Sequence, residues 1–528
     1  MGIRDAGGGW LETVFPMDGG LCARGLCVGE LAARVRRGTA HDGPTGRNLI
    51  LDEGIAEAGS RLRGASGVDI IVDGNHRGEV LSLAAGLAAA HPARIRSFVA
   101  LPAEDLLVLA HAWASGATTA GIEVLDDVDG LLVVGDPFSS NPRSAKPILA
   151  FKRRNRRAPL AVIDSTPRRT AVFATHPVIV EPGRVPAAVA CAVPAAAAAV
   201  IRQSPREVDP TGALERALVA LGKCGRVGVI IASQPGRGCS WPSAAYYAGL
   251  LARSQGTKLG VLTQYGNARG AARFIASGML QPVGHLTSIA PEGRAAVVIG
   301  ERDSCLPTGD IADWAARASV VIRGGFSAES DAGTLSFPGV GFFEDEGSIL
   351  TPEEQWEWVP AALSPPVGIP TTPVLLRAIL EAGGYGVDSE RPVLPEYPEL
   401  VTPPALEERQ AVEGAGPLRG ILAADPEQFV DGQLTGLTSL LGSRIPSVLM
   451  ATADCARYGV ADDSIVTLTT DFGVSSATVR SCGYQPSGVV AISNTNGETK
   501  TLFGWELCGG LPVAMPSRVT IGPAGSAT

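Results

Sequence analysis

Short apolar runs alternate with longer amphipathic segments over the first two thirds of the chain. Residues 68–72, 131–134 and 227–232 are almost wholly apolar, as expected for strands that are buried on both faces of a sheet. A turn containing Gly or Pro follows each run, and the next segment has apolar positions at helical spacing. Strands joined by crossovers of this length lie parallel, and ligands bind beyond their carboxyl ends. The pattern predicts an α/β fold.

The clearest unit spans residues 131–183. Its first strand, 131–134, ends in the turn Gly135-Asp136, and its second strand, 160–163, ends in a polar loop that begins at Asp164. Both loops follow the carboxyl ends of predicted parallel strands. The unit therefore predicts a ligand site at this edge of the sheet.

A similar unit returns at residues 295–330. A strand at 295–300 ends at Gly300, a helix is predicted at 310–316, and a strand at 320–323 precedes a glycine-containing loop. The two copies predict two ligand half-sites related by a pseudo-two-fold axis. A chance similarity between two βαβ units is the alternative.

The carboxyl-terminal part has a different pattern, in which short strands with alternating apolar positions are separated by turns with Gly. This pattern is typical of a small barrel. The predicted parts of the chain are an amino-terminal segment at 1–47, a discontinuous doubly wound α/β domain at 48–130 and 295–385, a central α/β domain at 131–294, a Pro/Glu-rich linker at 386–416 and a β-barrel at 417–528.

Composition describes an ordinary globular protein, with 45% hydrophobic and 18% charged residues in a chain of 528. The formal net charge of −9 offers no global attraction to nucleic acid or to an anionic membrane. The most apolar tract, 185–201, contains Pro186 and Pro194 and is shorter than the ~20 residues of a membrane-spanning helix. With no signal-peptide pattern at Met1, we expect a soluble, cytoplasmic protein without a membrane span.

The nine cysteines and six histidines are dispersed. Only Cys22 and Cys27 are near neighbours, and no C-x-x-C motif occurs, so neither a zinc knuckle nor a disulfide framework is indicated. We therefore predict no metal site made of local His and Cys ligands.

Six short motifs occur in an order that resembles the molybdopterin oxidoreductase superfamily. This group contains molybdenum and tungsten formate dehydrogenases, and the large iron–sulfur subunit of NADH-quinone oxidoreductases shares its fold. The motifs lie at residues 133–137, 163–170, 180–183, 264–270, 298–303 and 344–348. The carboxyl-terminal part resembles the dinucleotide-binding β-barrel of that family, which is a double-psi type.

The resemblance implies that the two βαβ halves each hold a pterin guanine dinucleotide, carrying Mo or W between them. Glycine lets the backbone approach a phosphate, carboxylates accept hydrogen bonds from guanine or ribose, and arginines pair with phosphate. The implied cofactor-binding residues are Gly135, Asp136, Asp164, Ser165, Arg168, Arg169, Gly183, Asn267, Gly270, Gly300, Glu346 and Gly347. A solvated loop, whose arginines bind carboxylates or a partner subunit, is the alternative for Arg168 and Arg169.

The amino-terminal segment departs from the family at its cluster cysteines. Residues 21–25 resemble the phrase Leu-Cys-x-Lys-Gly, with Arg24 in place of Lys, but residues 1–21 contain no Cys. Because a [4Fe–4S] cluster needs about four thiolates, Cys22 and Cys27 do not complete a [4Fe–4S] site in this chain. The resemblance makes 1–47 a degenerate remnant of a cluster domain.

The expected metal ligand is also missing. Segment 98–121, where the family places Cys, selenocysteine, Ser or Asp, contains no Cys. His111 is either a buried helix histidine or a catalytic base, and Arg24 either lies between cluster and pterin or forms a surface ion pair. Glu104 and Asp105 suit the first turn of a helix. Arg184 follows Pro182-Gly183 where the family has Thr-Asp.

Two functions follow from these features. The first is a structural, cofactor-poor subunit of a multi-subunit electron-transfer complex, whose partners are redox subunits that carry iron–sulfur clusters or flavin. The second is a catalytic Mo or W bis-pterin oxidoreductase that acts on formate or another small molecule. The missing cysteines favour the first, and the retained pair of dinucleotide-like loops favours the second.

Overall fold

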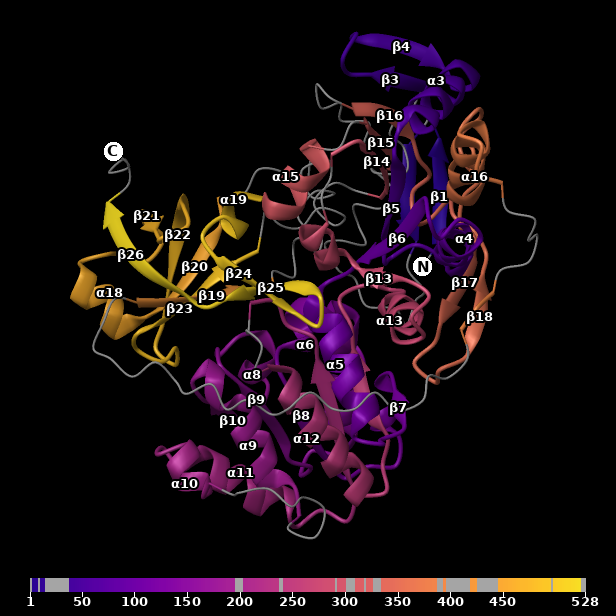
Figure 1. The fold of residues 1–528 in the computed structure, drawn as a ribbon. Helices are drawn as coiled ribbons and strands as arrows, with labels where there is room; N and C mark the ends of the chain where they lie inside the picture. Colours follow the sequence, from indigo (N-terminus) through magenta and orange to yellow (C-terminus); the bar gives the residue numbers. More distant parts are fainter. Residues whose placement is uncertain are drawn as a thin grey trace.

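The computed structural model consists of two α/β parts and a β-barrel (Figure 1). It describes residues 2–7, 10–14, 38–194, 203–236, 241–289, 292–300, 309–317, 320–325, 334–386, 393–395, 418–424, 445–494 and 497–523. Arg24, Cys22, Cys27 and nearly all of the predicted linker lie outside these residues.

The first α/β part is an eight-stranded sheet. Strands β5 (Gly67–Asp73), β6 (Ile95–Ala100), β14 (Arg294–Ile299) and β15 (Val320–Gly325) form its parallel centre. The strand order is β13 (Gln281–Pro282), β6, β5, β14, β15, β16 (Thr334–Pro338), β3 (Thr39–Asp42) and β4 (Arg47–Ile50), with β3 and β4 antiparallel. Its helices are α3 (Leu51–Gly64), α4 (Gly78–Ala90), α13 (Ala268–Ala276), α15 (Gly309–Arg317) and α16 (Thr372–Ala382).

The second α/β part is a six-stranded sheet in which every strand is parallel to its neighbour. The strand order is β10 (His176–Ile179), β9 (Leu160–Asp164), β8 (Gly130–Val134), β11 (Val227–Ala232), β12 (Leu259–Leu262) and β7 (Thr119–Ala120). The helices of this part are α5 (Ala103–Ala114), α6 (Pro137–Ser140), α7 (Ala145–Arg154), α8 (Arg169–Val172), α9 (Val185–Ala192), α10 (Pro205–Val208), α11 (Ala213–Leu221) and α12 (Trp241–Ser254).

Residues 418–523 contain a closed six-stranded barrel. The strand order is β19 (Leu418–Ala423), β23 (Val489–Ser493), β20 (Ser447–Ala451), β22 (Val474–Cys482), β21 (Ile465–Thr469) and β26 (Ser517–Pro523). The pairs β19/β23 and β20/β22 are parallel and the other neighbours antiparallel. Helices α18 (Thr452–Tyr458) and α19 (Gly497–Lys500) lie in the same part of the chain.

The remaining described strands form three two-stranded hairpins. These are β1 (Gly2–Gly7) with β2 (Trp10–Val14), β17 (Gly347–Leu350) with β18 (Trp356–Val359), and β24 (Gly504–Cys508) with β25 (Leu511–Met515).

The predicted fold class is confirmed: parallel βαβ units in two sheets are followed by a barrel. The chain leaves the first sheet after β6, builds the second between β7 and β12, and returns at β13, so the first α/β part is discontinuous. The boundaries predicted from the sequence stay predictions.

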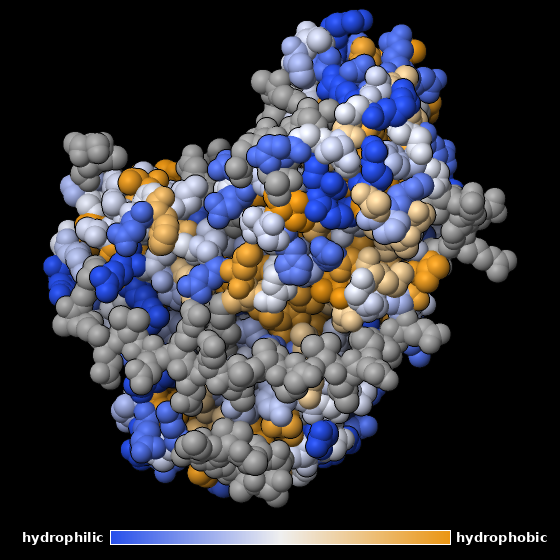
Figure 2. Space-filling view, viewed as in Figure 1, coloured by the Kyte–Doolittle hydropathy of each residue, from blue (hydrophilic) through white to orange (hydrophobic). Residues whose placement is uncertain are grey.

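One apolar core joins the two α/β parts. It contains Ile70 and Val72 of the first sheet together with Leu132 and Val134 of the second, and α5 and α12 pack between them. The barrel has its own core, which includes Val448 and is built mainly from aliphatic residues. Figure 2 shows apolar surface gathered in the hollow where the three parts meet. In the described part of the chain, no helix is both long and apolar enough for a membrane crossing.

Candidate functional site

Each sheet has a point where the strand order changes direction, between β8 and β11 in one and between β5 and β14 in the other. Ligands of doubly wound folds bind in the crevice at such points. Gly135 follows β8 with a φ of 89°, and Gly300 follows β14 with a φ of 126°. The two predicted half-sites therefore have equivalent places in the two sheets.

The space beside Gly135 is filled by the protein itself. A Cβ built on Gly135 would lie 3.0 Å from the ring of Trp241 and 3.1 Å from Gln234, and Trp241 is fully buried. The backbone N–H of Gly135 donates to the carbonyl of Ile163 at 2.9 Å. This glycine accommodates an indole ring, and its N–H is not directed at a phosphate.

The carboxylate of Asp136 holds the first helical turns in place. Its Oδ1 accepts hydrogen bonds from the backbone N of Thr170 at 2.9 Å and from Thr170 Oγ1 at 2.5 Å, while Oδ2 accepts one from Ser139. Because Asp136 is 1% exposed, these hydrogen bonds replace the hydrogen bonds to water that the carboxylate loses on burial. Asp136 thus ties β8 to α6 and α8.

The loop after β9 meets the barrel. Asp164 Oδ1 accepts the backbone N–H of the fully buried Ser165 at 2.6 Å, and Arg168 donates to the carbonyl of Ala424 just after β19. Arg169 is exposed. The barrel also packs on the loop after β11, because a Cβ on Gly236 would lie 2.4 Å from that of Leu422.

In the other half-site, the loops that follow β14 and β15 lie outside the described residues, but the predicted residues Asn267 and Gly270 are described. Asn267 donates to the carbonyl of His76 at 2.6 Å and accepts from Leu350 N at 3.3 Å, so it joins α13 to both the loop after β5 and β17. A Cβ built on Gly270 would lie only 2.4 Å from Oδ1 of Asn267, which is closer than van der Waals contact allows.

The remaining predicted residues are scattered. Gly347 has a φ of 144° and lies against Glu79, whose carboxylate accepts from Ser348 N at 2.8 Å and from its Oγ at 2.6 Å. Glu346 is exposed, and Gly183 lies half-buried in the short turn Pro182–Arg184, which follows the edge strand β10 of the second sheet.

Two acidic residues have a larger role than the sequence predicted. Asp105 accepts from the backbone N of Gln264 at 2.8 Å and of Tyr265 at 2.9 Å, and Glu104 accepts from Gly236 N at 3.0 Å. Burial raises the pKa of Asp105 to about 6, although its hydrogen bonds from Gln264 and Tyr265 oppose the shift. The two carboxylates fix the loops after β11 and β12; their position in the first turn of α5 gave no sign of these distant partners.

His111 is a buried residue of α5. Its Nδ1 lies 2.8 Å from the carbonyl oxygen of Leu107, and burial lowers its pKa. This environment favours a neutral ring held by its own helix. In the described part of the chain, no group of three or more His, Cys, Asp or Glu is arranged to hold a metal ion.

A buried ion-pair network anchors the β17–β18 hairpin to α13, α5 and β7. Glu354 contacts Arg269 at 2.8 Å and Arg273 at 2.6 Å, and its Oε1 also accepts from Trp113 Nε1 at 3.0 Å and Thr119 Oγ1 at 2.8 Å. Burial opposes ionisation, but Arg269 and these hydrogen bonds lower the pKa of Glu354. We assign this network a structural role, because the carboxylate of Glu354 is paired with the guanidinium groups of Arg269 and Arg273.

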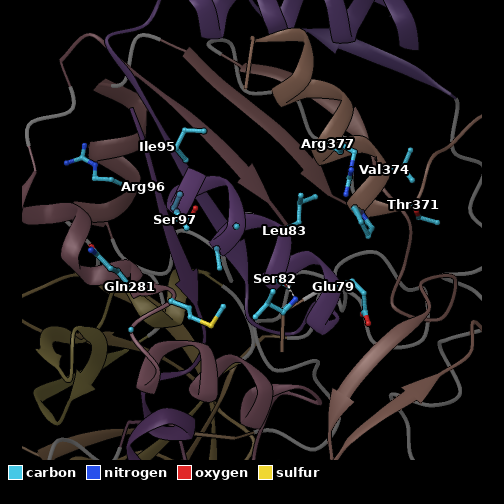
Figure 3. Close-up of a pocket in the computed structure, with 18 of the residues that line it drawn as sticks. Glu79, Ser82, Leu83, Ile95, Arg96, Ser97, Gln281, Thr371, Val374 and Arg377 are labelled. Carbon is cyan, nitrogen blue, oxygen red and sulfur yellow. Dashed lines mark hydrogen bonds between the residues drawn. The ribbon is translucent and has the colours of Figure 1, made fainter. Parts of the chain in front are cut away.

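A cavity of about 820 Å³ lies between α4, α16 and the β17–β18 hairpin (Figure 3). Its wall is mixed: Leu83 and Val374 are apolar, while Glu79 and Arg96 are already engaged with Ser348 and Asp69. It borders Glu346 and reaches Ile95 and Arg96 at the amino end of β6, whereas the switch-point loops follow the carboxyl ends of the strands. The cavity holds no pair of groups arranged as nucleophile and base.

The described residues of the predicted site fit a pterin dinucleotide poorly. Asp136 and Asn267 are bonded to protein groups, and the space at Gly135, Gly270 and Gly347 is filled by side chains. A bound dinucleotide needs free N–H donors and open space at these loops. The polar groups instead hold the three parts of the molecule together.

No family model and no curated protein matches the sequence. Among solved structures, the chain is similar to acetylene hydratase from Pelobacter acetylenicus, with a TM-score of 0.64 and 10% sequence identity over 99% of this chain and 98% of that one. At this identity the likeness shows the fold alone. The two chains share one fold over nearly their whole length.

Proposed function

We propose that this chain is a structural subunit of a multi-subunit electron-transfer complex, with a molybdopterin-oxidoreductase-like fold and reduced cofactor content. The proposal rests mainly on the hydrogen bonds of Asp136, whose carboxylate accepts three of them from Thr170 and Ser139. A carboxylate whose oxygens are already hydrogen-bonded to the protein keeps the loop closed. The proposed partners of the chain are redox subunits that carry iron–sulfur clusters or flavin.

The second candidate is a catalytic Mo or W bis-pterin enzyme acting on formate or another small molecule. Two observations support it: the matched solved structure is an enzyme by name, and glycines with positive φ stand at both switch points, at Gly135 and Gly300. Under this alternative, binding of the dinucleotide would have to displace Trp241 from its buried place beside Gly135.

Elemental analysis separates the two candidates. The intact complex, purified from its native host under anaerobic conditions, is assayed for Mo, W and Fe, and the pterin is extracted and quantified against the amount of this chain. The structural role predicts Mo, W and pterin far below one per chain, with Fe assigned to partner subunits. Stoichiometric Mo or W with two pterins per chain would overturn the structural proposal and establish the enzyme.

A further inference from the structure

A cationic cavity lies at the opposite edge of the second sheet from the switch-point loops. It has a volume of about 750 Å³ and lies at the amino ends of β9 and β10, between the end of α7 and the turn after α11. Five of its lining residues are cations and one is a carboxylate: Arg153, Arg154, Arg156, Arg157, Lys223 and Asp129. This concentration of positive charge stands in a chain of net charge −9.

The cations of this cavity lack partners within the described residues. The four arginines are exposed, and neither they nor Lys223 form an ion pair or side-chain hydrogen bond in that part of the chain. Asp129, the acidic group of the wall, is engaged: its carboxylate accepts the backbone N–H groups of Gly225 at 2.9 Å and Arg226 at 2.8 Å. Like charges held together in this way repel one another unless an anion lies among them.

Helix capping accounts for only part of the cluster. Arg153 and Arg154 end α7, where cations suit the helix macrodipole. Arg156 and Arg157 lie beyond that helix, and Lys223 comes from a different element. The surrounding field is positive as well, because His176 in the wall has a pKa lowered by burial and by Lys152 and Arg216.

We propose that this cavity binds a compact ligand that bears two or more phosphoryl groups. Four of the five cations are arginines, whose planar forks pair phosphate oxygens bidentately. The volume suits a small ligand, since ligand cavities measure roughly 300 to 1,000 Å³. The apolar side chains of its wall are the small residues Ala158, Pro159 and Ala220, and they form no pocket for the large aromatic anchors that are enriched in the core of a protein interface.

Calorimetric titration of the full chain with inorganic tripolyphosphate tests the proposal. We expect one site per chain, with an affinity that falls steeply as NaCl is raised. The variant R156E/R157E should weaken binding more than about tenfold, because two charge-assisted contacts become repulsive, and K223E, from another element, should weaken it as well. The control R47E/R518E makes the same change of net charge on exposed strands elsewhere and should bind like the wild type.

Companion titrations decide the ligand class and guard against misfolding. ADP should bind at the same site, whereas a polyglutamate peptide that binds as tightly as tripolyphosphate would overturn the phosphoryl assignment. Because the arginines repel one another, R156E/R157E should melt no lower than the control, and a lower melting temperature would indicate a structural role. Absence of tripolyphosphate binding by the wild type at low salt, or equal binding by all variants, would overturn the proposal.

Discussion

Glu354 lies in the turn between β17 and β18 and is the centre of the network with Arg269 and Arg273. The variant E354Q removes the charge and leaves two buried arginines facing an amide. Breaking a buried ion pair from one side costs about 3 to 5 kcal/mol, so the free energy of unfolding in urea should fall by that amount. The adjacent, exposed Glu353 provides the control, and E353Q should change stability by less than about 0.5 kcal/mol. Equal effects of the two variants would contradict the network's role.

Asp105 should make stability depend on pH. Its pKa is raised from 3.8 to about 6 by burial, so the folded state holds a proton that the unfolded state has released. The stabilising contribution is therefore present at low pH and is lost as pH rises through 6. Relative to D105N, the wild type should lose about 2 kcal/mol of unfolding free energy between pH 4.5 and 7. Urea titrations of both proteins measure the difference, and a difference that is independent of pH would show that Asp105 is ionised throughout.

Single residues show what the sequence could and could not predict. Gly135 and Gly300 were expected at strand ends, and the structure gives both a positive φ. Their expected partner was a phosphate, but Gly135 faces Trp241, which lies more than a hundred positions along the chain. The same holds for Asp105, whose hydrogen bonds with Gln264 and Tyr265 depend on the packing of α5 against α13 and the strand ends. Residue type and spacing contain no information on such contacts.

Among the loops, the one after β11 holds the barrel in place. Gly236 and Gly256 have similar φ values, 68° and 62°, but only Gly236 has a close neighbour, Leu422 of β19. Alanine at either position should cost about 1 to 2 kcal/mol from the backbone conformation. G236A should cost more, since its methyl group would overlap Leu422 and displace the barrel.

Hydrogen exchange followed by mass spectrometry locates that effect. In G236A, the amides of β19 (Leu418–Ala423) should exchange faster than in the wild type, whereas G256A should leave them unchanged because nothing lies within 4 Å of its added Cβ. If both variants lose equal stability and β19 is protected equally, the barrel does not depend on the Gly236 contact.

Helices and strands were the most predictable elements. The strand expected at 227–232 is β11 (Val227–Ala232), and the helix expected at 310–316 is α15 (Gly309–Arg317), because the spacing of apolar residues and the flanking turns are local properties of the sequence. The spacing of hydrophobic residues alone did not predict that the two sheets share one core. Nor did it predict the position of the β17–β18 hairpin, which Glu354 and Asn267 fix through partners far along the sequence.

At the scale of the whole molecule, the chain should fold without a pterin. Its two α/β parts share one apolar core, and the contact from Arg168 to Ala424 joins the barrel directly to the loop after β9. A ligand that binds only the folded state stabilises it by about 2.7 kcal/mol at a hundred times its Kd. A chain that binds no pterin gains nothing from the supply of that cofactor.

Expression in a host that cannot synthesise molybdopterin tests this independence. The purified chain should melt within about 2 °C of the same chain from a pterin-producing host, since a change of 1 kcal/mol shifts the midpoint of a domain of 150 to 250 residues by about 2 to 4 °C. The control is a pterin-dependent enzyme expressed in the same two hosts, whose melting temperature must fall without its cofactor. A chain that precipitates or melts much lower in the deficient host depends on the pterin, and the closed loops at Asp136 and Asn267 would then have to open around it.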